Sequence, residues 1–181
     1  SVGKFYSASH PPLLIWTGYF ITLIFGVNAI VLKSIILILS LLSILLILLI
    51  GRELFSLKIA FYSSLIFCSN IIFTVFSQRF QFDIPYTFLI LLSFYFLILY
   101  NNTRKYKYII YTGITFGACL MIKILVGFYI PIVIFASYII LKDKSNFKLK
   151  DIAVLTAIGV TIALPWHAYM LWTYGTEFTD Y

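Results

Sequence analysis

Apolar residues fill most of the chain, and charged residues interrupt them only at intervals. Six charge-free runs result, at 34–50, 59–78, 84–103, 108–122, 124–141 and 152–176. A charged side chain at the bilayer centre costs about 2.5–3.5 kcal/mol, and a spanning helix needs about 20 apolar residues. None of the runs alternates apolar and polar residues with a period of two, which a membrane barrel would require. The pattern therefore predicts an all-α fold, a polytopic bundle of about six transmembrane helices.

An earlier apolar stretch, residues 13–32, is separated from the first run only by Lys33. A single helix over 13–50 would be about 57 Å long, nearly twice the thickness of the hydrocarbon layer. Gly26 and Asn28 offer a break. We therefore predict an interfacial helix from Leu13 to about Phe25 and a true span from about Ala29. A seventh span is the alternative.

Composition agrees with this membrane class. The chain has 181 residues, of which 62% are hydrophobic and only 10% charged. Soluble domains carry about 25% charged residues, so a water-exposed domain is excluded. The net charge of +7 would suggest a nucleic-acid partner in a soluble protein, but here we attribute it to membrane orientation and expect no nucleic acid. Cys68 and Cys119 lie inside apolar runs and indicate neither a disulfide framework nor a metal site.

The basic residues of the predicted loops divide unequally between the two sides of the membrane. With six spans, one side receives Arg52, Lys58, Arg104, Lys105, Lys107, Lys142, Lys144, Lys148 and Lys150. The other side receives Lys4, Lys33, Arg79 and Lys123. The positive-inside rule places the larger group in the cytoplasm and both chain ends outside.

We predict one membrane domain over residues 1–181. It comprises an outer loop and interfacial helix at 1–28, six transmembrane helices at 29–172 and the start of an outer loop at 173–181. The chain begins at Ser1 without the charged region, short apolar core and cleavage site of a signal peptide. We therefore expect it to be an internal part of a longer, multi-pass cell-membrane protein.

The few ionisable residues beside the outer ends of the spans are candidates for a functional site. They include His10, Lys33, Arg79, Asp83 and Lys123. Such residues are costly to place near lipid and suggest a function, although a side chain that only extends into water is the alternative.

Three of these residues have specific local readings. Arg79 and Asp83 are four residues apart, so on one helical face they would form an ion pair. Asp83 and Pro85 also resemble a helix start, with Asp83 as N-cap. Lys123 lies in a short outer turn, where its ammonium group could meet a lipid phosphate. At the last outer end, Pro165 is typical of a helix stop.

Several short motifs occur in a suggestive order. They are His10-Pro11-Pro12-Leu13, then Phe25-Gly26-Val27-Asn28 with Lys33, Gly51-Arg52 with Leu54-Phe55, Arg79 with Asp83 and Pro85, Lys123, and Pro165-Trp166 followed by Tyr174-Gly175 and Glu177-Phe178. Together they resemble the polyprenyl-phosphate-sugar-dependent glycosyltransferases of the type C membrane fold. This group contains the protein O-mannosyltransferases and the lipid A aminoarabinose transferase.

The resemblance implies transfer of a sugar from a polyprenyl-phosphate donor to a lipid, glycan or protein acceptor on the extracytoplasmic face. A departing phosphate needs positive charge nearby, and the acceptor needs a carboxylate to take its proton. In the family that carboxylate is an Asp in the outer loop after the first span, so the resemblance implies a catalytic base upstream of Ser1.

For the residues present, the resemblance implies substrate-binding roles. His10 stands at the motif position that contacts phosphate, with Asp83, Lys123, Arg79 and Lys33 nearby. Ser9-His10 departs from the Glu-Lys of the aminoarabinose transferase, so neither the sugar nor that enzyme's phosphate contact is assigned. A divalent cation stays open as a cofactor, but no cluster has metal-ligand spacing.

Two other functions compete with the glycosyltransferase. Asp83 and Lys123 beside spans are also compatible with a polytopic transporter, which would contain a second, inverted half. A flippase or scaffold for polyprenyl lipids, without catalysis, is the third reading.

Overall fold

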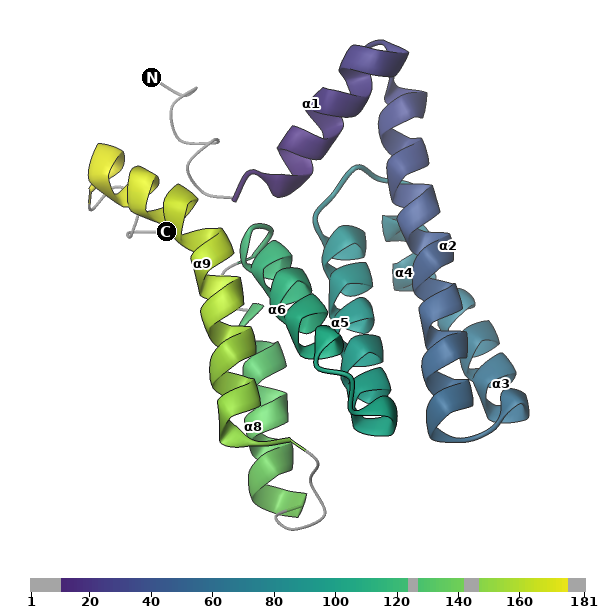
Figure 1. Ribbon diagram of the computed structural model, residues 1–181. Coiled ribbons are helices and arrows are strands. Elements are labelled where there is room, and N and C mark those ends of the chain that lie inside the picture. The colour runs from purple at the N-terminus through teal and green to yellow at the C-terminus, as the bar shows by residue number, and fades with distance from the viewer. Residues whose placement is uncertain (1–10, 124–126, 142–146, 176–181) are drawn as a thin grey trace.

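The computed structural model describes residues 11–123, 127–141 and 147–175, and these residues form helices without any strand. In chain order the helices are α1 (Leu13–Phe25), α2 (Ala29–Leu54), α3 (Leu57–Cys68), α4 (Ile71–Phe76), α5 (Asp83–Thr103), α6 (Lys107–Leu120), α8 (Tyr129–Leu141) and α9 (Leu149–Tyr174). Figure 1 shows most of them side by side, with α1 inclined across one end. The predicted all-α class is confirmed.

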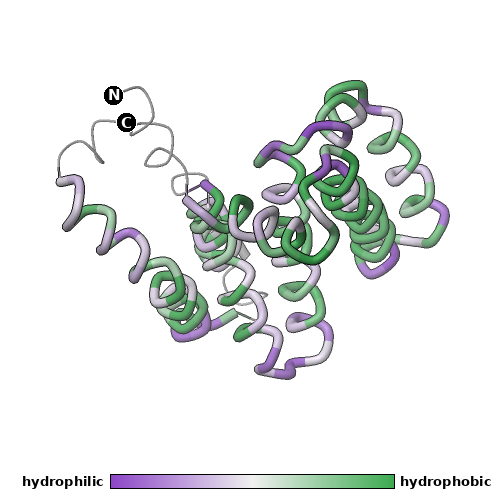
Figure 2. The backbone as a smooth tube through the Cα atoms, turned by 90° about the horizontal axis from the view of Figure 1, so that it is seen from above, coloured by the Kyte–Doolittle hydropathy of each residue, from purple (hydrophilic) through white to green (hydrophobic). Residues whose placement is uncertain are grey.

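Three of the described helices, α2, α5 and α9, are long and apolar enough to cross a membrane. The other predicted spans correspond to shorter helices, namely α3 with α4, α6 and α8. Figure 2 shows hydrophobic residues along most of the helices and hydrophilic ones gathered at their ends and turns. The described part of the chain therefore contains three candidate spans, and six crossings stay a prediction.

The run at 59–78 is divided because Asn70 starts a new helix. Its Oδ1 accepts hydrogen bonds from the backbone N–H groups of Ile72 and Phe73, at 2.9 and 3.2 Å. A side-chain oxygen that satisfies the first amides of a helix is a typical N-cap. The prediction of one unbroken helix over this run is wrong for this reason.

The break between the first two helices lies where the sequence predicts it. α1 ends at Phe25, Gly26 follows with φ of 82°, and α2 begins at Ala29. The Asn28 side chain accepts a hydrogen bond from Ile30 N–H at 2.9 Å, which caps α2. With 13 residues, α1 is about 20 Å long and is not one of the helices long enough to cross a membrane.

Glycines allow α6 and α9 to approach closely. A Cβ atom at Gly113 would lie 2.8 Å from Ile158 Cβ, and one at Gly117 would lie 2.8 Å from Ile162 Cβ. From the other helix, a Cβ at Gly159 would overlap the ring of Phe116. Gly113 and Gly117 thus form a close helix contact, which is how small residues act between membrane helices.

A buried polar contact ties α5 to the start of α9. The Tyr100 hydroxyl donates to Asp151 Oδ2 at 2.9 Å, and the same oxygen accepts from Lys148 N–H at 2.9 Å. Asp151 is fully buried, and the Tyr100 ring lies 5.6 Å from that of Phe147. The sequence gives no sign of this pairing, because the two residues are far apart along the chain.

Pro165 does not end the last helix, so that prediction is wrong. α9 continues through it to Tyr174. Proline removes one backbone donor and bends a helix without always ending it. Figure 1 shows α9 bending toward its C-terminal end, which extends away from the other helices.

Candidate functional site

The start of α1 packs against the end of α6. Pro11 and Pro12 are buried, and Pro12 is the residue before the helix. The backbone N–H of Leu13 donates to the carbonyl of Met121 at 3.2 Å. Proline suits this position because the first amides of a helix have no partner within it. The Pro-Pro-Leu segment is thereby held at Met121, which lies two residues before Lys123 in the chain.

Lys123 forms an ion pair with Asp83. Its Nζ donates to Asp83 Oδ1 at 2.7 Å, with 35% of the lysine side chain and 44% of the aspartate side chain exposed. The contact joins the turn after α6 to the first turn of α5. Two of the predicted site residues are therefore brought together, and both can still be reached from outside the protein.

The predicted ion pair of Arg79 with Asp83 is not observed within the described part of the chain, so that prediction is wrong. Arg79 lies in the bend after α4, before α5 begins, and is exposed. Spacing of four residues brings side chains together only when both stand on one helix. Asp83 is paired with Lys123 instead.

Asp83 is the first residue of α5, and its N-cap is Phe82. The predicted N-cap position is thus one residue too late, whereas Pro85 lies in the first turn as expected. A carboxylate here lies at the positive end of the helix dipole, an arrangement that stabilises the helix.

The loop before α5 covers α1. A Cβ atom at Gly18 would lie 2.8 Å from Phe80 Cζ, so the phenylalanine ring rests on the glycine. Leu14, Ile36 and Ile84 form a buried cluster next to this contact. The loop that carries Arg79 and leads into Asp83 is therefore held against α1.

The Pro-Trp motif of α9 reaches the same region. The rings of Trp16 and Trp166 meet edge to face with centroids 5.7 Å apart. Trp166 also packs on the large buried apolar cluster that includes Phe116 and Ala163. Edge-to-face contacts are favoured by the charge distribution of aromatic rings. Motifs that lie far apart in sequence thus meet around α1.

An apolar cavity of about 180 Å³ lies beneath α1. Its walls include Leu13, Pro85, Leu89 and Ile122, which places it next to the Asp83–Lys123 pair. Thr17 also lines it, but its hydroxyl donates to the carbonyl of Leu13 at 2.7 Å. The cavity therefore suits a hydrocarbon chain better than a sugar.

The other predicted site residues make no described contact with the Asp83–Lys123 pair. Lys33 is exposed on α2 and, like Arg79, forms no ion pair in the described ranges, whose other ion pair is Arg52 with Glu53. His10 lies outside the described residues. Residues 11–123, 127–141 and 147–175 contain no group of three or more His, Cys, Asp or Glu side chains that could hold a metal ion.

Gln81 is a candidate that the sequence did not single out. It stands between Arg79 and Asp83, and its Oε1 atom is buried without a hydrogen-bond partner in the described structure. Such an acceptor is costly unless something donates to it. A glutamine between two phenylalanines in a loop carries no sequence signal, so only the structure could reveal it.

A comparison with protein families decides the class. Residues 9–172 match the model of the dolichyl-phosphate-mannose-protein mannosyltransferase family. The chain belongs to this family. The match includes all the elements around the Asp83–Lys123 pair, and it makes the protein a membrane glycosyltransferase, as the resemblance predicted. Searches of curated proteins and of solved structures found no significant match.

Proposed function

We propose that this mannosyltransferase-family protein transfers a sugar from a polyprenyl-phosphate donor to a lipid, glycan or protein acceptor on the outer face of the membrane. The observation that supports this best is the Lys123–Asp83 pair, partly exposed beside an apolar cavity. It combines a cation for a phosphate with space for a hydrocarbon chain.

The reaction we propose is substitution at the anomeric carbon. The acceptor's nucleophile forms a bond to that carbon, while the bond to the phosphate oxygen breaks and the electron pair leaves with the lipid phosphate. A cation near that oxygen lowers the barrier because negative charge develops there. Lys123 can supply it, since an ammonium group is a compact point charge on a flexible stem.

Asp83 has two roles in this proposal. One carboxylate oxygen holds Lys123 in position, as the 2.7 Å contact allows. The other accepts a hydrogen bond from a hydroxyl group of the sugar. The acceptor's proton goes to a different carboxylate, the aspartate that the resemblance implies upstream of Ser1.

The donor lipid would extend from this pair into the cavity beneath α1. His10, whose motif continues into the buried Pro11 and Pro12, is then the second phosphate contact. Arg79 and Lys33, both exposed, would add positive charge at longer range. In this arrangement the outer-face basic residues serve the donor, and the cytoplasmic ones set orientation.

Substitution of Lys123 by Met tests the proposal. Removing one charged stabiliser of a transition state typically lowers turnover about 10²–10³-fold. We expect a loss of that order in a sugar-transfer assay of membranes that contain the protein with all of its natural sequence. Asp83→Asn should also lower turnover, because the amide holds the ammonium group more weakly.

The matched control is Lys58→Met, which removes an exposed lysine of α3 and should leave transfer unchanged. The amount of inserted protein is measured in parallel by extraction of the membranes. Wild-type turnover in Lys123→Met and Asp83→Asn would overturn the assignment of the site.

A further inference from the structure

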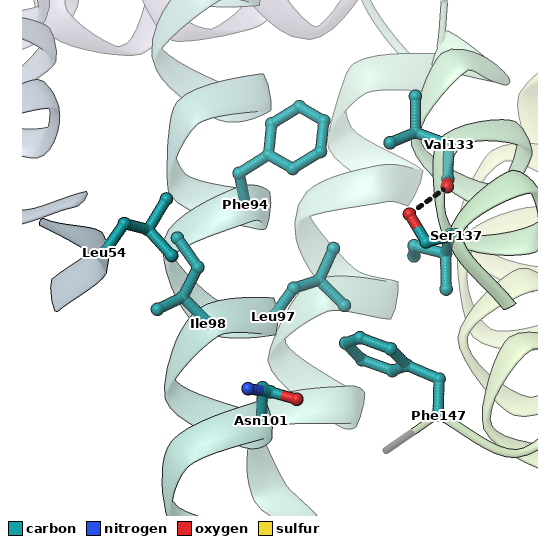
Figure 3. A pocket seen from close by; sticks show the side chains of 9 residues that line it. Leu54, Phe94, Leu97, Ile98, Asn101, Val133, Ser137 and Phe147 are labelled. Atoms are coloured by element: carbon teal, nitrogen blue, oxygen red, sulfur yellow. Dashed lines mark hydrogen bonds between the residues drawn. The ribbon is translucent and has the colours of Figure 1, made fainter. Parts of the chain in front are cut away.

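A second apolar cavity lies toward the opposite end of α5 (Figure 3). Its volume is about 240 Å³, and its walls include Leu54 of α2, Phe94 and Asn101 of α5, Val133 of α8, and Phe147. Asp83 and Asn101 are about 27 Å apart along α5 at 1.5 Å per residue. This cavity is therefore separate from the site beneath α1.

The shape and lining of the cavity suit a hydrocarbon chain. It follows α5 for about 10 Å, from Phe94 to Asn101 at 1.5 Å per residue. The Ser137 hydroxyl, which also lines it, donates to the carbonyl of Val133 at 2.8 Å and is thus satisfied internally. Figure 3 shows Asn101 and Phe147 together at one end of the cavity and Phe94 farther along.

Two basic residues follow the residues that mark this end, Asn101 and Phe147, closely in the chain. Arg104 is exposed and ends α5 one turn beyond Asn101, and Lys148 is exposed directly after Phe147. Among the acids of the described residues at this end, Glu53 lies 3.5 Å from Arg52, and Asp151 is fully buried. The described exposed side chains at this end are thus mainly basic.

The wall at this end is held in place by polar contacts. The ring of Phe147 lies 5.6 Å from that of Tyr100, whose hydroxyl donates to Asp151. Asn102 of α5 donates to Glu53 of α2 at 3.1 Å, which joins the two helices that flank the cavity. The cavity is thus bounded by a connected set of side chains.

We propose that this cavity binds one acyl chain of an anionic phospholipid, whose phosphate lies between Arg104 and Lys148. Apolar walls below a cluster of basic residues match the two parts of such a lipid, and basic residues near a membrane surface attract anionic headgroups. The proposal rests on this cavity and does not depend on sugar transfer.

Native mass spectrometry of the purified protein, expressed with all of its natural sequence, tests this binding. The probes are palmitoyl-oleoyl phosphatidylglycerol and the phosphatidylcholine with the same chains. We expect one tightly retained phosphatidylglycerol, with a dissociation constant at least fivefold below that of phosphatidylcholine. Arg104→Gln and Lys148→Gln should each weaken it about fivefold, whereas Lys58→Gln should leave it unchanged.

Val133→Phe provides a second measurement, because the larger side chain narrows the cavity without removing charge. It should weaken binding of both lipids, with the melting temperature monitored to confirm folding. Equal affinity for the two lipids in the wild type, or unchanged binding in Arg104→Gln with Lys148→Gln, would overturn the proposal. Displacement of phosphatidylglycerol by undecaprenyl phosphate in equal amounts would also overturn it and assign the cavity to the donor.

Discussion

At the scale of single residues, the ion pair of Lys123 and Asp83 contributes more to the site than to stability. Both side chains are more than a third exposed. Such pairs add at most about 1 kcal/mol to the free energy of unfolding. A pair this exposed therefore contributes little to the free energy of folding. Function is the better explanation for keeping them there.

A charge exchange separates these two contributions. Lys123→Asp alone places two carboxylates opposite each other and should lower both the melting temperature and sugar transfer. Adding Asp83→Lys restores an attractive pair, so the melting temperature should recover. Transfer should not recover, because the cation then stands on α5 instead of after α6.

The measurements are thermal unfolding in detergent and the transfer assay, on the single and double variants together. Recovery of transfer in the double variant would show that only the pairing matters. In that case Lys123 would not be the phosphate contact.

The partner of Asp83 could not be read from the sequence. Arg79 is four residues away and was the natural choice, whereas Lys123 is 40 residues away and meets Asp83 only through the packing of α5 and α6. Both residues were nevertheless recognised as candidates, because charges are scarce beside apolar runs. Composition thus identified the residues of the pair, and tertiary structure decided the pairing.

At the scale of helices, the close contact of α6 with α9 depends on small residues. Gly159 faces the buried ring of Phe116, so no side chain fits between them. Gly159→Val should separate the helices and lower the melting temperature, because overpacking costs about 1–3 kcal/mol. Ala157→Val, on an exposed position of the same helix, is the control and should have little effect.

The readout is thermal unfolding of both variants in the same detergent. Equal melting temperatures for Gly159→Val and the control would contradict the contact. The wild-type value for both would mean that α6 and α9 adjust freely to an added side chain.

Helix boundaries were predictable where a local rule acts alone. Gly26 and Asn28 end one helix and cap the next, and both act within a few residues. Asn70 follows the same capping rule, but a long apolar run hid it. Pro165 suggests a helix stop by the local rule, yet α9 continues past it to Tyr174.

At the scale of the whole molecule, the uneven distribution of basic residues predicts orientation. Arg79 and Lys105 are both exposed and lie at opposite ends of α5. In a background that lacks Cys68 and Cys119, Arg79→Cys should react with a membrane-impermeant maleimide added to intact cells. Lys105→Cys should react only after the membrane is opened, because the side rich in basic residues stays inside.

The experiment has a built-in comparison, since each variant is labelled before and after lysis. If Lys105→Cys were labelled in intact cells and Arg79→Cys were not, the protein would have the opposite orientation to the predicted one. It would also move the proposed site to the cytoplasmic face.

The break between α3 and α4 has a consequence for how the chain enters the bilayer. Unpaired backbone groups in hydrocarbon cost several kcal/mol each. Here the amides of Ser69 and Asn70 donate to the carbonyls of Leu65 and Phe67, and the Asn70 side chain accepts from the first amides of α4. These backbone groups at the break are thus hydrogen-bonded within the segment itself. The run can therefore insert as one hydrophobic segment although it is not one straight helix.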